Sequence, residues 1–269
     1  MSALQEVAVD PSLYEGYAID LDGTMYLGVE LLPGAAATIA ALRALDRRIV
    51  YLSNKPLDTR EHYAELLTRL GVPTRPEAIV NSSGVMVEYL QQCHPGARLF
   101  VIGEAPFQDE LRRGGCRLTE DPGRTDVVVA AFDRTFDYRK LQIAFDAIRG
   151  GARLVATNPD PYCPVPGGGL PDCGAITAAI EAATGVRADA VVGKPSETMA
   201  RAALSRLGVR PAEAIVVGDR LDTDVAMGVR AGMHTALVLT GATRREHIAA
   251  SSVRPEFVLE DLRGLLPRA

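Results

Sequence analysis

The chain has 269 residues, of which 47% are hydrophobic and 23% are charged, and its formal net charge is −5. This length and apolar content are enough to bury one large core or two ordinary ones, and we expect two. The acidic balance and the lack of any lysine or arginine run argue against a nucleic-acid partner. The first sixteen residues have no apolar core of signal-peptide length, and no later stretch is long enough to span a membrane, so we expect a cytoplasmic protein with no membrane partner.

Strand-like and helix-like segments alternate from the beginning of the chain. In the first part we expect strands at 17–20 and 49–52, with helices at 35–45 and 59–70. From about residue 81 a second series begins, with expected helices at 85–92, 106–113 and 138–149 and expected strands at 99–102, 127–131 and 154–156. The last part has expected helices at 175–183 and 223–231 and expected strands at 190–192, 214–217, 235–239 and 257–259. This alternation predicts an α/β protein with a doubly wound parallel sheet.

The stretch 158–173 interrupts this alternation. It holds five prolines and three successive glycines, Gly167 to Gly169, and we expect an irregular loop there. Loops of this length in compact domains are usually functional or disordered. Cys163 and Cys173 bracket the glycine run, so a bridge between them is one alternative. We expect the four cysteines to be reduced, because their spacing matches no metal site and a chain of this size needs no disulfide.

Two aspartates at the end of the first expected strand carry the clearest chemical signal. Asp20 and Asp22 follow the apolar run 17–19 and precede Gly23, which lets the chain turn where the strand stops. Side chains two positions apart in a strand share a face, so both carboxylates can reach one small volume. Such a pair predicts a divalent metal or a raised pKa. A simple turn is the alternative, whereas a calcium loop is excluded because no Glu closes it.

Three other expected strands also end in polar residues. Ser53 and Asn54 offer a hydroxyl and backbone amides, Lys194 follows Gly193 as a single positive charge, and carboxylates begin at Asp219. Each of these has an ordinary structural explanation when taken alone. Ligands of open α/β sheets bind beyond the carboxyl ends of the strands, so we expect the four strand ends to converge on one site.

In this order, the segments DLDGT, LSN, VGKP and VVGDRLDTD resemble the four motifs of the haloacid dehalogenase (HAD) superfamily of aspartate-nucleophile phosphatases. ATNPD, GKPS, GDRLDTD and LVLTG are similar to subfamily IIA, the p-nitrophenylphosphatase and NagD-like nucleotide monophosphatase group. The likeness extends from about Tyr17 to Gly241. It implies a Rossmann-like HAD core of residues 1–81 and 187–269, with an inserted α/β cap of the C2 type at 82–186.

The resemblance also implies roles for the polar strand ends. Asp20 would be the nucleophile that forms an aspartyl-phosphate, and Asp22 would be the acid and then the base. The metal would be Mg²⁺, which prefers carboxylate ligands and bridges to phosphate. Its ligands would be Asp20, the backbone carbonyl of Asp22, and Asp219, with Asp224 orienting them. The phosphate group would be held by Ser53, Asn54, Lys194, Gly23 and Thr24.

The part of the substrate beyond the phosphate would be recognised by the cap. Our candidates are Asn158, Asp160 and Tyr162 on the loop after ATNPD, with the run 167–169 giving the backbone room to bend. The alternative is that this loop only packs against the core. One departure from the family pattern is Lys55, a cation where the second motif often continues with Asn, Ser or Thr.

The sequence leaves several functional alternatives open. The expected function is hydrolysis of a small-molecule phosphate monoester, with nucleotide, sugar, glycerol and pyridoxal phosphates and phosphoglycolate all open as substrates. The alternatives are a regulatory or interaction protein that has lost turnover, and a phosphotransferase or phosphomutase. A homodimer formed through the cap is a further expectation from the resemblance.

Overall fold

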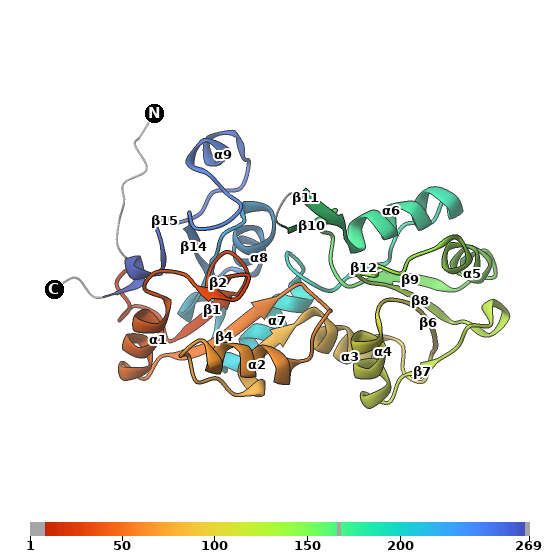
Figure 1. The fold of residues 1–269 in the computed structure, drawn as a ribbon, viewed down its shortest axis with the longest axis horizontal. Helices are drawn as coiled ribbons and strands as arrows, with labels where there is room; N and C mark the ends of the chain where they lie inside the picture. The colour runs from red at the N-terminus through yellow and green to blue at the C-terminus, as the bar shows by residue number, and fades with distance from the viewer. Residues whose placement is uncertain (1–8, 166–167, 267–269) are drawn as a thin grey trace. The chain divides into compact units, whose positions relative to one another are not determined.

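A computed structural model describes residues 9–165 and 168–266, and the chain divides into two compact units. The first unit contains the chain up to Ser53, Arg60–Val80 and the chain from Lys194 onward. The second unit contains Asn54–Thr59 and Asn81–Gly193. Each unit is built on its own sheet (Figure 1).

The first unit is a six-stranded sheet in the order β15-β14-β13-β1-β4-β5, and its central strands pair in parallel. The strands are β1 (Gly16–Asp20), β4 (Arg48–Ser53), β5 (Ile79–Asn81), β13 (Ala214–Gly218), β14 (His234–Val238) and β15 (Phe257–Leu259). All five residues of β1 and of β13 are buried, as expected for central strands covered on both faces. The carboxyl ends of these two strands therefore lie inside the unit.

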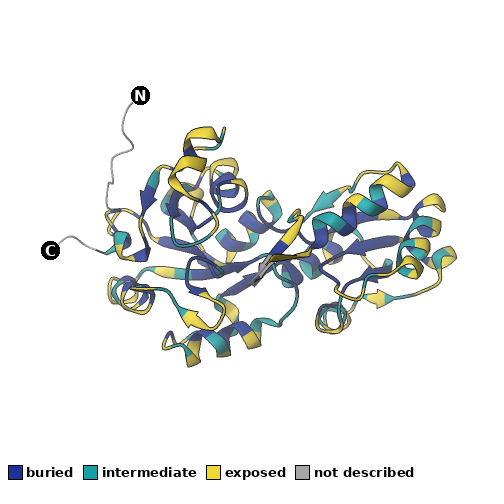
Figure 2. Cartoon of the chain, turned by 45° about the horizontal axis from the view of Figure 1, so that its top comes forward, coloured by how far each residue is buried: buried dark blue, intermediate teal, exposed yellow. Residues whose placement is uncertain are grey.

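Helices cover both faces of this sheet, which confirms the doubly wound α/β fold predicted from the sequence. Alternate residues of the strands, such as Tyr17 and Ile215, share an apolar core with α1 (Ala35–Ala44) and α2 (Arg60–Arg69). The opposite face is covered by α7 (Glu197–Leu207) and α8 (Ala226–Ala231), while α9 (Arg245–Ala250) follows β14. Figure 2 shows the resulting pattern, with buried strands and helices exposed on their outer sides.

A tight turn and a small hairpin follow β1. Backbone bonds from Gly23 to the Tyr26 carbonyl and from Met25 to the Leu21 carbonyl, both 2.8 Å, close the turn. The antiparallel strands β2 (Tyr26–Leu27) and β3 (Glu30–Leu31) come next. The sequence analysis did not identify this hairpin, because its strands are only two residues long.

The second unit has a five-stranded parallel sheet in the order β12-β9-β8-β6-β7. Its strands are β6 (Arg98–Ile102), β7 (Arg117–Leu118), β8 (Val127–Ala130), β9 (Arg153–Ala156) and β12 (Ala190–Val191). Its helices are α3 (Ser82–Cys93), α4 (Ala105–Arg113), α5 (Tyr138–Arg149) and α6 (Cys173–Thr184). Buried side chains from β6, β8, β9, α5 and α6 form one apolar core.

The position of β12 corrects one prediction. The strand before Gly193 was expected to be one of four strands whose ends converge in one sheet, but β12 pairs with β9 at the edge of the second sheet. The backbone N–H of Gly193 continues this association by donating to the carbonyl of Thr157 at 2.7 Å. Lys194 therefore begins the return of the chain to the first unit and does not end one of its strands.

The stretch 158–173 also differs from the irregular loop that was predicted. It contains an antiparallel hairpin of β10 (Tyr162–Val165) and β11 (Gly168–Pro171). A Cβ atom on Gly169 would lie 2.7 Å from Cδ2 of Tyr162, so glycine makes room for the tyrosine ring. Gly167, part of the run expected to give the backbone room, lies outside the described residues.

Two other expectations concern the chain as a whole. All four cysteines lie in the described part of the chain and none of them forms a disulfide, which agrees with the expected reduced state. Within residues 9–165 and 168–266, no helix combines the length and the apolar character that a membrane crossing requires.

Candidate active site

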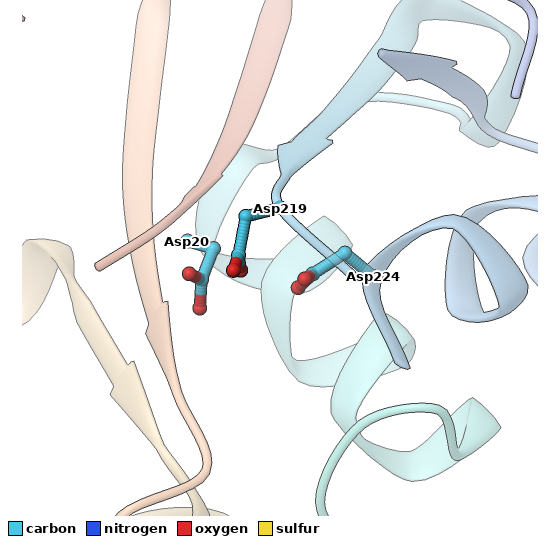
Figure 3. Close-up of side chains that lie close together, drawn as sticks. All are labelled: Asp20, Asp219 and Asp224. Atoms are coloured by element: carbon cyan, nitrogen blue, oxygen red, sulfur yellow. The ribbon is translucent and has the colours of Figure 1, made fainter. Parts of the chain in front are cut away.

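Three buried aspartates meet at the carboxyl ends of β1 and β13. Asp20 is the last residue of β1, Asp219 directly follows β13, and Asp224 lies in a π-helical turn, Leu221–Val225, before α8. The parallel register, in which Ile19 lies opposite Val217, brings the ends of the two strands to the same level. One carboxylate oxygen of each aspartate lies within 4.8 Å of the others, and Figure 3 shows the three side chains around a common space.

Lys194 is the cation of this cluster and is itself 4% exposed. Its Nζ donates a short hydrogen bond to Oδ1 of Asp20 and another, at 2.7 Å, to Oδ1 of Asp224. Asp224 also accepts from the backbone N–H of Arg220 at 3.2 Å. The cluster thus holds three carboxylates around one lysine. Buried charges of one sign in such excess need a further cation or a proton.

Glycines allow the aspartates to approach so closely. Gly23 has a φ of +84°, and a Cβ there would lie 2.6 Å from Oδ2 of Asp219. A Cβ on Gly241 would lie 2.0 Å from the same oxygen, and one on Gly218 would lie 2.2 Å from Cγ of Asp224. Both the turn after Asp20 and the segment after β14 must therefore lack side chains at these points.

The segment after β14 was not among the predicted site residues. The backbone N–H of Ala242 donates to Oδ2 of Asp219 at 2.6 Å, and the hydroxyl of Thr240 donates to the carbonyl of Gly23 at 2.6 Å. This segment therefore fixes Asp219 and the turn after Asp20 together. The glycine three residues after a buried strand, as in the tract LVLTG, was the available sequence signal.

The electrostatics of the cluster reflect its excess of negative charge. Burial raises the pKa of Asp20 well above its usual range; Lys194 opposes this effect, while Asp224 and Asp219 add to it. Burial, together with the neighbouring Asp224 carboxylate, raises the pKa of Asp219 to about 6. The pKa of Lys194 is raised despite its burial, because the charges of Asp20 and Asp224 outweigh the loss of solvent.

The same residues fit a hard divalent cation. Carboxylate oxygens are the protein ligands that Mg²⁺ and Ca²⁺ prefer, and three are within reach of one point. Oδ1 of Asp219 is fully buried, and no group in the described part of the chain forms a hydrogen bond with it. Such orphaned buried acceptors are rare in native proteins, and a bound cation would satisfy this one.

The other predicted residues of the first unit occupy different positions around this cluster. Asp22 is partly exposed and is not one of the three clustered carboxylates. Ser53 is buried at the end of β4, which pairs with β1 so that Leu52 lies opposite Asp20. The N–H groups of Gly23 and Thr24 donate to the carbonyls of Tyr26 and Leu21 within the turn. The phosphate-binding role expected for these two residues stays a prediction.

Asn54 and the candidate recognition residues lie in the second unit. The side-chain amide of Asn54 donates to Oδ2 of Asp160 at 3.0 Å, and the buried Asn158 donates to the Asn54 carbonyl at 3.1 Å. Tyr162 on β10 is 56% exposed. The side chain of Asn54 is thus bound to the predicted recognition loop, and the phosphate-binding role expected for this residue stays a prediction.

A parallel α/β fold with buried acidic strand ends and one buried lysine is typical of phosphoryl-transfer enzymes, and comparison with known proteins identifies the family. Residues 17–117 match the family model described as haloacid dehalogenase-like hydrolase, and residues 191–265 match the model described as HAD-hydrolase-like. The sugar-phosphatase AraL of Bacillus subtilis is 36% identical over 263 residues, covering 98% of this chain and 95% of the relative. The acid sugar phosphatase of Staphylococcus epidermidis is 34% identical over 249 residues, covering 93% and 95%.

Solved structures agree with these sequence matches. The 4-nitrophenylphosphatase from Thermotoga maritima superposes with a TM-score of 0.90 at 34% identity, covering 95% of this chain and 97% of that one. NagD from Escherichia coli K-12 gives a TM-score of 0.85 at 29% identity, with coverages of 93% and 97%. The chain belongs to the HAD-like hydrolases, in subfamily IIA, and it is a phosphatase. Its second parallel sheet is that of the family's cap domain.

Proposed function

We propose that the protein is a Mg²⁺-dependent phosphatase that hydrolyses small-molecule phosphate monoesters through an aspartyl-phosphate on Asp20. The observation that carries this proposal is the buried group of Asp20, Asp219 and Asp224 around Lys194. Asp20, Asp219 and the backbone carbonyl of Asp22 would hold the ion, and Asp224 would orient this set through Lys194. When bound, Mg²⁺ offsets negative charge on the transferring phosphoryl group.

Hydrolysis would proceed in two steps, each carried out by side chains of this protein. In the first, a carboxylate oxygen of Asp20 attacks phosphorus, the ester P–O bond breaks, and Asp22 donates a proton to the departing alcohol oxygen. In the second, Asp22 takes a proton from water, which attacks the same phosphorus and releases inorganic phosphate and Asp20. The partial exposure of Asp22 suits this exchange of protons with substrate and water.

Other polar groups would hold the phosphate during both steps. Lys194 would offset the repulsion between the phosphate and Asp20, and the Ser53 hydroxyl and the backbone N–H of Asn54 would bind phosphoryl oxygens. Positioning and charge stabilisation of this kind supply most of the catalysis in phosphoryl transfer. Recognition of the rest of the substrate would fall to Asn158, Asp160 and Tyr162 in the second unit.

Sugar phosphates are the first substrate class to examine. Two relatives that match nearly the whole chain are named sugar phosphatases, and the exposed Tyr162 ring offers an aromatic face of the kind that packs against sugar rings. Nucleotide, glycerol and pyridoxal phosphates complete the panel. We further propose a cytoplasmic protein and a homodimer formed through the second unit, for which gel filtration is the test.

The decisive experiment compares variants of two aspartates in the first unit, one in the cluster and one exposed. Asp20→Asn removes the nucleophile and should reduce turnover of p-nitrophenyl phosphate with Mg²⁺ by about 10⁴-fold or more, as loss of a catalytic nucleophile does in other enzymes. Asp222→Asn changes an exposed aspartate of the same motif and should retain wild-type activity. Full activity of Asp20→Asn, or full activity of the wild type in a chelator, would contradict the proposal.

A further inference from the structure

Asn54 is the residue at which the chain first enters the second unit, and Gly193 is the residue at which it leaves that unit for the last time. Both lie against the same short segment, which begins the recognition loop after β9. Gly193 donates to the Thr157 carbonyl at 2.7 Å, and Asn158 donates to the Asn54 carbonyl at 3.1 Å. The two chain crossings and the start of the loop therefore form one connected group.

The side chain of Asn54 extends this connection further along the loop. Its Nδ2 donates to Oδ2 of Asp160 at 3.0 Å, while the backbone N–H of Asp160 donates to Oδ1 of Asn158 at 3.0 Å. The carbonyl of Asp160 in turn accepts from the N–H of Gly174 in α6 at 2.8 Å. Asp160 is thus held from Asn54, from Asn158 and from the start of a helix.

Two neighbours fix Asn54 in the position that this bond requires. The buried hydroxyl of Ser82, at the start of α3, donates to the Asn54 carbonyl at 2.7 Å. A Cβ on Gly193 would lie 2.6 Å from Oδ1 of Asn54 and 2.5 Å from the Thr157 carbonyl, so only glycine leaves space for the asparagine side chain. The amide of Asn54 is therefore directed at Asp160 by the packing around it.

We propose that Asn54 is a positioning residue for the recognition loop: its side chain holds Asp160, and with Gly193 it fastens residues 157–160 to the two chain crossings. Asn54 would then affect substrate preference, because a loop can discriminate between substrates only when its recognition groups are held in fixed positions. This inference rests on the proposed phosphatase function. It gives the side chain of Asn54 a second role, beside the phosphate binding proposed for its backbone N–H.

A double-mutant cycle tests the pairing of Asn54 with Asp160. Asn54→Ala, Asp160→Ala and the double variant are compared by kcat/KM on p-nitrophenyl phosphate and on a panel of sugar and nucleotide phosphates. Each single variant should change the ratio of kcat/KM between esters by about 3-fold or more, and the double variant should change it no further, as coupled residues do. A uniform loss on every ester that adds in the double variant would overturn the inference in favour of direct phosphate binding.

Hydrogen exchange provides a readout that needs no substrate. The amides of Asp160 and Gly174 should exchange faster in Asn54→Ala and in Asp160→Ala to a similar extent, because either change frees the same segment. The swapped variant Asn54→Asp with Asp160→Asn restores an amide–carboxylate pair and should restore protection. Unchanged exchange in both single variants would refute the fastening.

The controls separate this inference from the proposed function. Gln142 donates to Asp146 at 3.0 Å on the exposed side of α5, so Gln142→Ala removes a bond of the same chemistry and should alter neither ester ratios nor exchange at Asp160. An inactive wild type would refute the phosphatase proposal, whereas the exchange data would still decide whether Asn54 holds Asp160. An active wild type with unaltered ester ratios in all three variants would refute only the positioning role.

Discussion

Each unit has a lysine bound to a buried aspartate near the carboxyl end of a strand of its parallel sheet. The two clusters differ in charge balance. In the second unit, Lys140 donates to Asp133 at 2.6 Å and to the hydroxyl of Thr135 at 2.6 Å. One cation there meets one carboxylate, and the pair is complete. In the first unit Lys194 faces three carboxylates, one of which has an orphaned oxygen.

This difference separates a structural ion pair from a chemical site. A balanced buried pair needs nothing further, whereas an excess of buried carboxylates is unfavourable unless a cation or a proton joins it. The second unit therefore uses its pair to fix the loop after β8, and the first unit retains an excess of negative charge that a bound metal ion would offset. Charge balance distinguishes the two more clearly than burial does, because Asp133 and Asp20 are both buried.

Removing the two lysines should give the largest contrast between the units. Lys194→Met leaves Asp20 and Asp224 facing each other without their cation, and we expect a loss of kcat/KM of at least about 10³-fold together with about 3 kcal/mol or more of stability in the metal-free protein. Lys140→Met should reduce the free energy of unfolding while retaining kcat. Assays with p-nitrophenyl phosphate and urea unfolding measure both effects, and a comparable loss of kcat in the two variants would contradict the comparison.

Adding one methyl group tests the close packing of the first unit. Gly241→Ala would place Cβ 2.0 Å from Oδ2 of Asp219, so the aspartate or the backbone must move. We expect about 10²-fold lower activity, about 1–3 kcal/mol of lost stability and weaker binding of Mg²⁺ measured by calorimetry. A Cβ atom on Gly168 in the second unit would have no neighbour within 4 Å. Gly168→Ala should therefore leave activity, stability and Mg²⁺ binding unchanged. Normal Mg²⁺ affinity in Gly241→Ala would argue against Asp219 as a ligand.

The hairpin of the second unit should affect substrate preference without changing the chemical steps of hydrolysis. Tyr162→Ala removes an exposed ring from β10, and we expect kcat/KM for sugar phosphates to change relative to p-nitrophenyl phosphate by about 3- to 10-fold, the effect of losing one apolar contact. Tyr138, which is 78% exposed on α5, provides the matched control as Tyr138→Ala. If the ratio of kcat/KM between the two esters is the same in Tyr162→Ala and Tyr138→Ala, Tyr162 is not a recognition residue.

Much of the fold could be predicted because local signals agreed with the final packing. The helix expected at 138–149 is observed as Tyr138–Arg149, and at its start the side chain of the N-cap residue Asp137 accepts a hydrogen bond from the Lys140 N–H. The hairpin at β10 and β11 was not predicted, since prolines and glycines in its strands are typical of loops. The sheet to which β12 belongs could not be inferred from two residues, because pairing depends on partners that are distant in sequence.

The site was predictable to the extent that it follows from strand ends. Asp20 and Asp219 come together because β1 and β13 are neighbours in register. The alternation of elements predicted that the strand ends converge, but it did not predict which strands are neighbours. The alternation of helices and strands does not predict which way a side chain points where the chain passes from one unit to the other. The family motif accordingly gave no indication that the side chain of Asn54 binds Asp160, a contact between positions 106 residues apart.

The last expected effect concerns pH and one buried carboxyl of the second unit. Burial, with a contribution from the nearby Asp160 carboxylate, raises the pKa of Asp172 from 3.8 to about 6. The folded protein therefore binds this proton more tightly than the unfolded chain, so its contribution to stability is complete below about pH 4 and is lost as pH rises to about 6. The loss is at most about 3 kcal/mol, from 1.36 kcal/mol per pKa unit.

Asp172→Asn should remove this dependence while keeping a side-chain acceptor for the N–H of Cys173, to which Asp172 is bonded at 2.5 Å. Urea unfolding at pH 4, 5, 6 and 7 would then show a stability difference between variant and wild type that shifts in favour of the variant as pH rises. A constant difference across this range would mean that Asp172 titrates normally. In that case the buried carboxylates of the second unit would all be satisfied, and unfavourable buried charge would be confined to the cluster around Lys194.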